Sequence, residues 1–129
     1  MTKYEVEKKY VLIYVCIFIA CLFLVMCRWI NVIDPTVVLL PQMILLHATN
    51  FALSLMVMLS FGFTVLVFGG KKKMIVIAGV LLAALNIIYE LVCPLLNTVD
   101  IADALFGLLG IGIAYVYLIQ LKKNGLIMK

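Results

Sequence analysis

Apolar residues along this chain fall into four long runs, and each run is bounded by polar or charged residues. The runs cover residues 10–30, 41–70, 74–93 and 101–121. A run of about 20 apolar residues can cross the hydrocarbon core of a bilayer as a helix. Within that core a helix satisfies its own backbone hydrogen bonds. The pattern therefore predicts an all-α integral membrane protein, with four transmembrane helices in a compact bundle that forms one domain, residues 1–129.

Proline and glycine residues punctuate these runs and predict where helices begin and end. Asp34 and Pro35 can serve as the N-cap and first position of a short lead-in to the second helix. Pro41 would either kink that lead-in or mark the true start. Gly69–Gly70 is expected to end the second helix, and Pro94 is expected to stop the third.

Composition and charge placement support a membrane protein and suggest its orientation. Hydrophobic residues make up 67% of the chain and charged residues 12%, with a mean hydropathy of +1.29. The net charge of +4 does not indicate a nucleic-acid partner, because the basic residues flank the apolar runs.

The positive-inside rule places both termini in the cytoplasm of a multi-pass protein of the bacterial plasma membrane. The first run is as long as a full span and no cleavage site follows it, so we expect no cleavable signal peptide. Of the ten Lys and Arg residues, only Arg28 falls on the opposite side from the termini. The nine on the side of the termini are Lys3, Lys8, Lys9, Lys71, Lys72, Lys73, Lys122, Lys123 and Lys129.

Polar residues of four different helices are predicted to lie at one depth. At a helical rise of about 1.5 Å per residue, Arg28, His47, Glu90 and Asp103 each lie about 25 to 33 Å from the cytoplasmic end of their helix. Each is therefore expected near the outer boundary of the hydrocarbon core, which is about 30 Å thick. The outer end of the bundle is predicted to carry a polar cup.

Residue spacing predicts which side chains share a helix face. Asn86 lies four residues before Glu90, and Asn50 lies three residues after His47, so each pair shares a face. Asp100 and Asp103 share a face that continues through small residues, which would let the last helix approach a neighbour closely. That small face consists of Gly107, Gly110 and Ala114.

Several of these residues also have a purely structural interpretation. Asp100 can cap the last helix, with Asp103 in the first turn. Arg28 can be a solvated charge, and His47 alone can be a packing residue. Glu90 fits a structural account worst, since a negative charge at a helix C-terminus is disfavoured and intramembrane acids are usually paired. Its expected partner is Arg28, His47, a cation or a ligand headgroup.

The chemistry of the chain points to binding more than to catalysis. His47, Glu90 and Asp103, with Asp100 nearby, can hold a divalent cation, although their spacing matches no established metal motif. No nucleophile stands beside the single histidine, so we expect no enzyme and no cofactor. Among the cysteines, Cys16 and Cys21 are expected to be buried apolar residues. Cys27 and Cys93 can pair in an oxidising compartment or remain free thiols.

The polar residues resemble the pattern of the VanZ-like family, named for a teicoplanin-resistance protein. The resemblance covers about residues 42–115 and rests on a His that opens one helix, a Glu that ends the next, and Asp residues and spaced glycines that open the last. The chain departs from the family pattern at Cys93, where a Gln is common, in the stretch "CPLLNTVD", which lacks an Arg, and at Gly107, where an Asn is common. The resemblance implies a cell-envelope membrane protein linked to glycopeptide tolerance. The matching positions are His47 followed by Phe51, Glu90, Asp100, Asp103, Gly107 and Gly110.

Two functions from different classes follow from these observations. In the first, the outer polar cup binds a lipid-linked or cation-bridged headgroup, such as that of a lipid-linked cell-wall intermediate. In the second, the protein is a subunit of a homo-oligomeric or hetero-oligomeric membrane assembly, such as a defence effector, an immunity protein or a transporter accessory subunit. An enzyme acting on a lipid headgroup is a third, weaker possibility. The first two differ in whether the small face of the last helix contacts helices of the same chain or of another copy.

Overall fold

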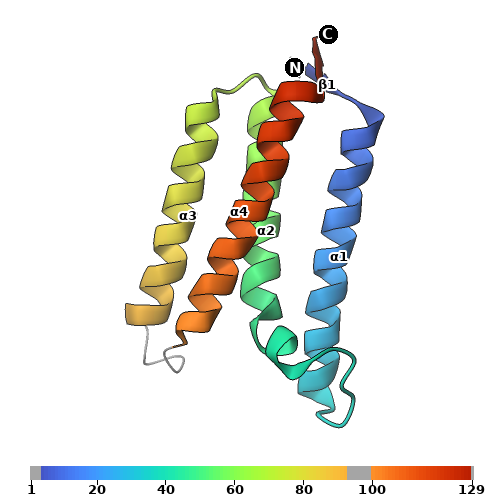
Figure 1. Cartoon of the computed structure of the whole chain (residues 1–129), viewed down its shortest axis with the longest axis vertical. Coiled ribbons are helices and arrows are strands. Elements are labelled where there is room, and N and C mark those ends of the chain that lie inside the picture. Colours follow the sequence, from blue (N-terminus) through green and yellow to red (C-terminus); the bar gives the residue numbers. More distant parts are fainter. Residues whose placement is uncertain (1–3, 93–99, 129) are drawn as a thin grey trace.

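The structure, a computed structural model, describes residues 4–92 and 100–128. Its helices are α1 (Lys8–Ile33), α2 (Gln42–Val67), α3 (Lys72–Val92) and α4 (Ile101–Asn124), which run up and down beside one another (Figure 1). All four are long and apolar enough to cross a membrane. The four predicted helices are therefore confirmed, and each lies within a few residues of its predicted bounds.

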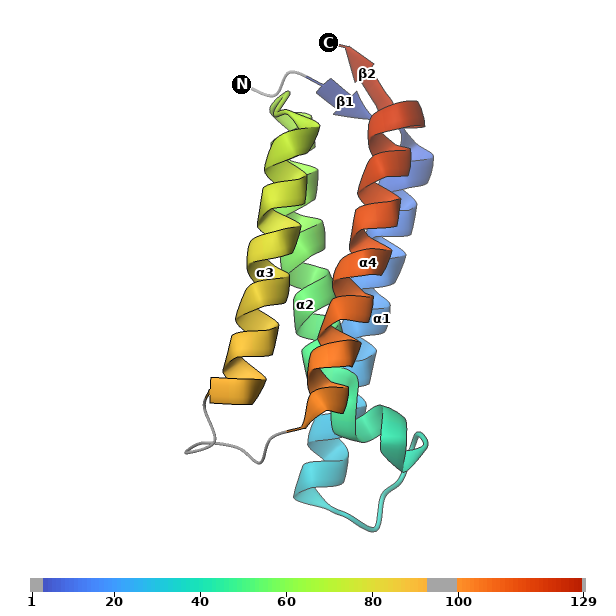
Figure 2. The ribbon, with the colours of Figure 1, turned by 60° about the vertical axis from the view of Figure 1, so that its left-hand side comes forward.

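A short two-stranded sheet, which the apolar pattern did not predict, joins the two ends of the described chain. Strand β1 (Tyr4–Val6) pairs antiparallel with β2 (Leu126–Met128), and Glu5 lies opposite Ile127. The Glu7 N–H also donates to the Gly125 carbonyl at 3.0 Å. Both ends of the chain thus lie at the same end of the bundle, beside the α2–α3 turn; we call this the terminal end, and the opposite end the loop end (Figures 1 and 2).

The helix boundaries confirm two of the predicted helix starts and ends and correct a third. Pro41 is the N-cap of α2, and Gly69, with a φ of 80°, follows α2 in the left-handed conformation that glycine adopts readily. The predicted lead-in helix at Asp34 is wrong, because Asp34 is instead the C-cap of α1. Its carboxylate accepts hydrogen bonds from the Thr36 N–H and hydroxyl, which stabilises a turn in place of a helical start. The predicted stop at Pro94 lies outside the described residues.

Helices α2 and α4 form the centre of the bundle, and α1 and α3 flank them. In the most apolar stretch of each helix, 44% of residues are buried in α2 and in α4, but only 17% in α1 and in α3. Figure 1 shows α3 and α1 on opposite sides of the central pair. Fully enclosed side chains of the core include Met58, Leu59 and Leu66 from α2 and Leu118 and Leu121 from α4.

The outward faces of the helices are apolar. Leu12 and Ile19 of α1 and Leu85 of α3 are each at least 60% exposed. Such a surface is stable in hydrocarbon and unfavourable in water. The cysteines of α1 divide between the two environments: Cys21 and Cys27 are buried, whereas Cys16, expected to be buried, lies on the exposed face.

Candidate functional site: a polar cluster at the loop end

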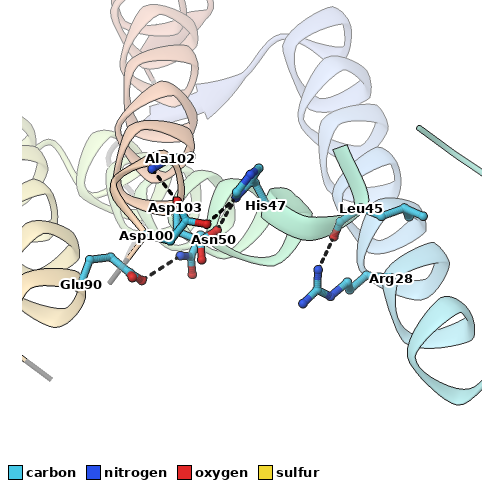
Figure 3. Close-up of polar contacts among 8 residues, drawn as sticks. All are labelled: Arg28, Leu45, His47, Asn50, Glu90, Asp100, Ala102 and Asp103. Atoms are coloured by element: carbon cyan, nitrogen blue, oxygen red, sulfur yellow. Dashed lines mark hydrogen bonds and ion pairs between the residues drawn. The ribbon is translucent and has the colours of Figure 1, made fainter. Parts of the chain in front are cut away.

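Three predicted site residues converge at the loop end, and we call them the loop-end cluster: His47, Asp100 and Asp103 (Figure 3). His47 Nδ1 lies 2.7 Å from Asp103 Oδ1 and 4.0 Å from Asp100 Oδ2. The side chains differ in exposure, at 9% for His47, 18% for Asp103 and 45% for Asp100. The cluster therefore has a buried imidazole at its base and a carboxylate at its open side.

The start of α4 places the two aspartates. Asp100 is the N-cap of α4, and its Oδ1 accepts from the Ala102 N–H at 2.9 Å. Asp103 follows in the first turn, where a negative charge is stabilised by the helix dipole. The predicted cap is confirmed. It uses Oδ1 of Asp100 and leaves Oδ2 directed at His47, so capping and a role in the cluster are compatible.

The imidazole of His47 is fixed by contacts on two sides. Its Nδ1 is hydrogen-bonded to Asp103, and its ring stacks on Phe106 with the centroids 4.9 Å apart and the planes 19° apart. Phe106 lies three residues after Asp103 on α4, so both contacts come from one face of that helix. Sequence reasoning missed Phe106, although its spacing from Asp103 was an available signal.

Glu90 lies at the same end of the bundle but has a different partner from those expected. It is 4% exposed, and its Oε1 accepts from Asn50 Nδ2 at 3.2 Å. Its Oε2 is buried without a hydrogen-bond partner. Neither Arg28 nor His47 is bonded to Glu90 in the described part of the chain, so these two of the four expected alternatives are excluded, and a cation or a headgroup as the partner stays a prediction. A buried acceptor without a partner is unfavourable, and it marks Glu90 as the least satisfied polar group of the cluster's surroundings.

A second polar contact joins α2 and α3 one turn further into the bundle. Asn86 Nδ2 donates to Ser54 Oγ at 3.0 Å and to the Leu82 carbonyl at 3.1 Å. With the Asn50–Glu90 bond it forms a ladder of two polar rungs, which follows from the four-residue spacing on each helix. Ser54 was missed as a site residue, although it lies four residues after Asn50. A groove of about 210 Å³ runs along this seam, and its lining includes Asn50, Ser54 and Asn86 with apolar side chains such as Leu53 and Leu85.

The small face of α4 packs within its own chain. A Cβ placed on Gly107 would lie 2.6 Å from Asn86 Oδ1, and one on Gly110 would lie 2.5 Å from the Phe51 carbonyl oxygen. Ala114 has no exposed surface. The predicted close approach of the last helix to a neighbour is confirmed, and the neighbours are α2 and α3 of the same chain.

Arg28 lies apart from the acids. Its Nη1 donates to the Leu45 carbonyl at 2.7 Å, a contact that ties the loop end of α1 to the first turn of α2 (Figure 3). None of the ion pairs between described residues includes Arg28. Its expected membership of the polar cup is therefore corrected: it holds α1 to α2 at the same end of the molecule.

The candidate metal ligands also differ in one member from the predicted set. The group with metal-ligand spacing is His47, Asp100 and Asp103, whose ligand atoms all lie within 4.8 Å of one another. Glu90, predicted as a ligand, is held by Asn50 and is not in that group. Cys93 lies outside the described residues, so its pairing with Cys27 stays a prediction; Cys27 is buried and forms no disulfide with another described cysteine.

Comparison of the chain with models of protein families, with curated proteins and with solved structures found no match. A functional assignment for this protein is therefore built on the geometry described above.

Proposed function

We propose that the protein is a multi-pass protein of the bacterial plasma membrane, with the terminal end in the cytoplasm and the loop end at the outer face. The four apolar helices and their exposed apolar faces support insertion in a bilayer. The described lysines of the helix ends support the orientation, since Lys8, Lys9, Lys72, Lys122 and Lys123 belong to the terminal end. Among the described residues, Arg28 is the only Lys or Arg at the loop end.

At that outer end, we propose, the protein binds the headgroup of a lipid or of a lipid-linked cell-wall intermediate. The observation that carries this proposal is the convergence of His47, Asp100 and Asp103 from α2 and α4, with a buried base and one open side. Ionisable groups at a membrane boundary are costly and are usually functional. A headgroup would lie at the depth of the cluster, and its chains would lie along the apolar outer faces of the bundle.

The resemblance to the VanZ-like family is consistent with this function, because the residues that carry it include those of the loop-end cluster. A role in glycopeptide or envelope-stress tolerance is part of the same proposal. The protein would act there as a binding module and not as an enzyme.

The alternative, a subunit of a larger membrane assembly, receives less support. Its sequence argument was the small face of α4, which would be available to another copy. Gly107 and Gly110 instead contact Asn86 and Phe51 of the same chain, so that face is already occupied. A homo-oligomer formed through α1 or α3 would use a different surface.

Native mass spectrometry of the protein, extracted gently from its own membrane, tests the proposed function. We expect a defined lipid mass on the wild-type protein that is lost in Glu90→Gln and in Asp103→Asn. Asp34→Asn is the matched control, because Asp34 is also an acid of the loop end but its carboxylate accepts hydrogen bonds only from Thr36 among the described residues. Retention of the same lipid by both site variants would overturn the proposal, and a discrete oligomer without lipid would favour the assembly function.

A further inference from the structure

The ligand atoms of the loop-end cluster lie close to the spacing that they would have around one metal ion. His47 Nδ1 lies 2.7 Å from Asp103 Oδ1 and 4.0 Å from Asp100 Oδ2, and all three lie within 4.8 Å of one another. Metal–ligand bonds of about 2.0 to 2.2 Å place the ligand atoms of a tetrahedral site about 3 to 4 Å apart. A small widening of the His47–Asp103 contact and a slightly closer approach of Asp100 would therefore accommodate an ion.

A second observation, independent of the spacing, indicates that positive charge belongs at this end. The Glu90 side chain is buried, its Oε2 has no partner, and in Figure 3 its carboxylate points toward Asn50 and the aspartates. Arg28, the basic residue nearest in the fold, bonds to the Leu45 carbonyl instead. Asp100 and Asp103 thus face a single imidazole, Glu90 lies at the same end, and no described Lys or Arg is paired with any of these three carboxylates.

We propose that His47, Asp100 and Asp103 bind a divalent first-row metal ion, and that a phosphate oxygen of the lipid headgroup completes its coordination. This inference rests on the proposed headgroup-binding function. Imidazole and carboxylate ligands suit Zn²⁺ and Mn²⁺, and sites with three protein ligands leave a position open for an outside ligand. The open position faces the exposed side of Asp100.

The metal explains how an acidic cup can accept an anionic headgroup. Without an ion, the carboxylates would repel a phosphate; with one, they neutralise the ion and the ion attracts the phosphate. When the ion binds Nδ1, the hydrogen bond between His47 and Asp103 is replaced by two metal bonds. Nδ1 must be unprotonated to bind the ion, so a neutral His47 carries its single proton on Nε2, and a protonated His47 releases its Nδ1 proton to solvent.

Zinc binding to the full-length protein in nanodiscs, purified without a polyhistidine tag, tests the site directly. We expect one tightly bound Zn²⁺ per chain by elemental analysis, and a shift of the imidazole NMR signals on zinc addition. His47 is the only histidine in the chain, so those signals report this site alone. His47→Gln and Asp103→Asn should each weaken zinc binding by at least about tenfold, and Asp34→Asn should leave it unchanged.

Asp100→Asn still tests the metal site if His47→Gln or Asp103→Asn fails to fold. Asparagine caps a helix as well as aspartate does, so α4 is preserved while a charged ligand is lost. We expect weaker zinc binding with unchanged helix content. Absence of stoichiometric zinc in the wild type, or equal loss in Asp34→Asn, would overturn the metal site.

The lipid-bound protein separates this inference from the proposed function. Treatment with EDTA should remove the co-purifying lipid mass, and Zn²⁺ should restore it, with the mass distinguishing a lipid phosphate from free phosphate. A lipid that resists EDTA but is lost in Asp103→Asn would overturn metal bridging and leave headgroup binding intact. If the wild type holds neither lipid nor zinc, both proposals fail.

Discussion

The Tyr117 hydroxyl donates a 2.7 Å hydrogen bond to the Tyr10 carbonyl oxygen, across 107 positions of sequence. This bond links the terminal end of α4 to the first turn of α1, and both residues are buried. Tyr117→Phe should lower the free energy of unfolding by about 1 kcal/mol, since one buried hydrogen bond is lost without a change of packing. Unfolding in mixed micelles, followed by circular dichroism, would measure it. A variant as stable as the wild type would show that the bond contributes nothing.

Close packing of α4 on α2 predicts a large difference between two alanine substitutions in one helix. Gly110→Ala places a methyl group against the Phe51 carbonyl oxygen and should destabilise the protein by about 1 to 3 kcal/mol. Gly112 lies two residues away with open space around its Cα. Gly112→Ala should be neutral or stabilising by up to about 1 kcal/mol, because alanine favours the helix. Equal effects in the same unfolding assay would contradict the described interface.

The Asn50–Glu90 bond predicts a strong coupling between two substitutions. Asn50→Ala removes the partner of Oε1 and leaves both Glu90 oxygens unsatisfied, which should cost about 1 to 3 kcal/mol of unfolding free energy. Glu90→Gln removes the buried charge. Asn50→Ala should therefore lower the unfolding free energy less in the Glu90→Gln background than in the wild type. A double-mutant cycle measures this difference as a coupling energy. Additive effects would mean that the amide does not support the carboxylate.

Asp34 predicts a local dependence on pH. The Thr36 hydroxyl and N–H, at 2.6 Å and 3.0 Å, hold the pKa of its carboxyl below the usual 3.8. A pKa lowered by folding contributes stability that is fully present above the usual value and is lost as pH falls through the lowered one. Thr36→Val should raise this pKa toward 3.8, because the hydroxyl donates the stronger of the two bonds. An NMR titration of the Asp34 carboxyl would show it, and an unchanged pKa in Thr36→Val would contradict the turn.

Helix positions and their depth could be predicted from sequence because they depend on length and rise alone. The gathering of His47, Glu90, Asp100 and Asp103 at one end follows from counting residues along each helix. The cap at Asp100 and the turn at Gly69 follow from local chemistry, since a short acceptor or a positive φ is needed there. The close approach of α4 follows from its small residues.

Pairing between helices could not be predicted in the same way. When every face of a helix is apolar, periodicity does not fix its rotation or its neighbours, so Arg28 and Asn50 were equally available to Glu90. The structure assigns Asn50 to Glu90 and gives Arg28 a backbone carbonyl. The strands β1 and β2 are three residues each, too short for an alternating pattern to be recognised.

The central position of α2 and α4 sets an order for biosynthesis. These two helices share the most extensive contact in the bundle, yet α3 lies between them in the chain. During translation α2 enters the bilayer first and carries His47 and Ser54 with no partner from α4 or α3. Ser54 gains its partner Asn86 when α3 has been made, whereas His47 gains Asp103 only with α4. Assembly of the α2–α4 centre of the bundle therefore has to wait until the last helix has been made.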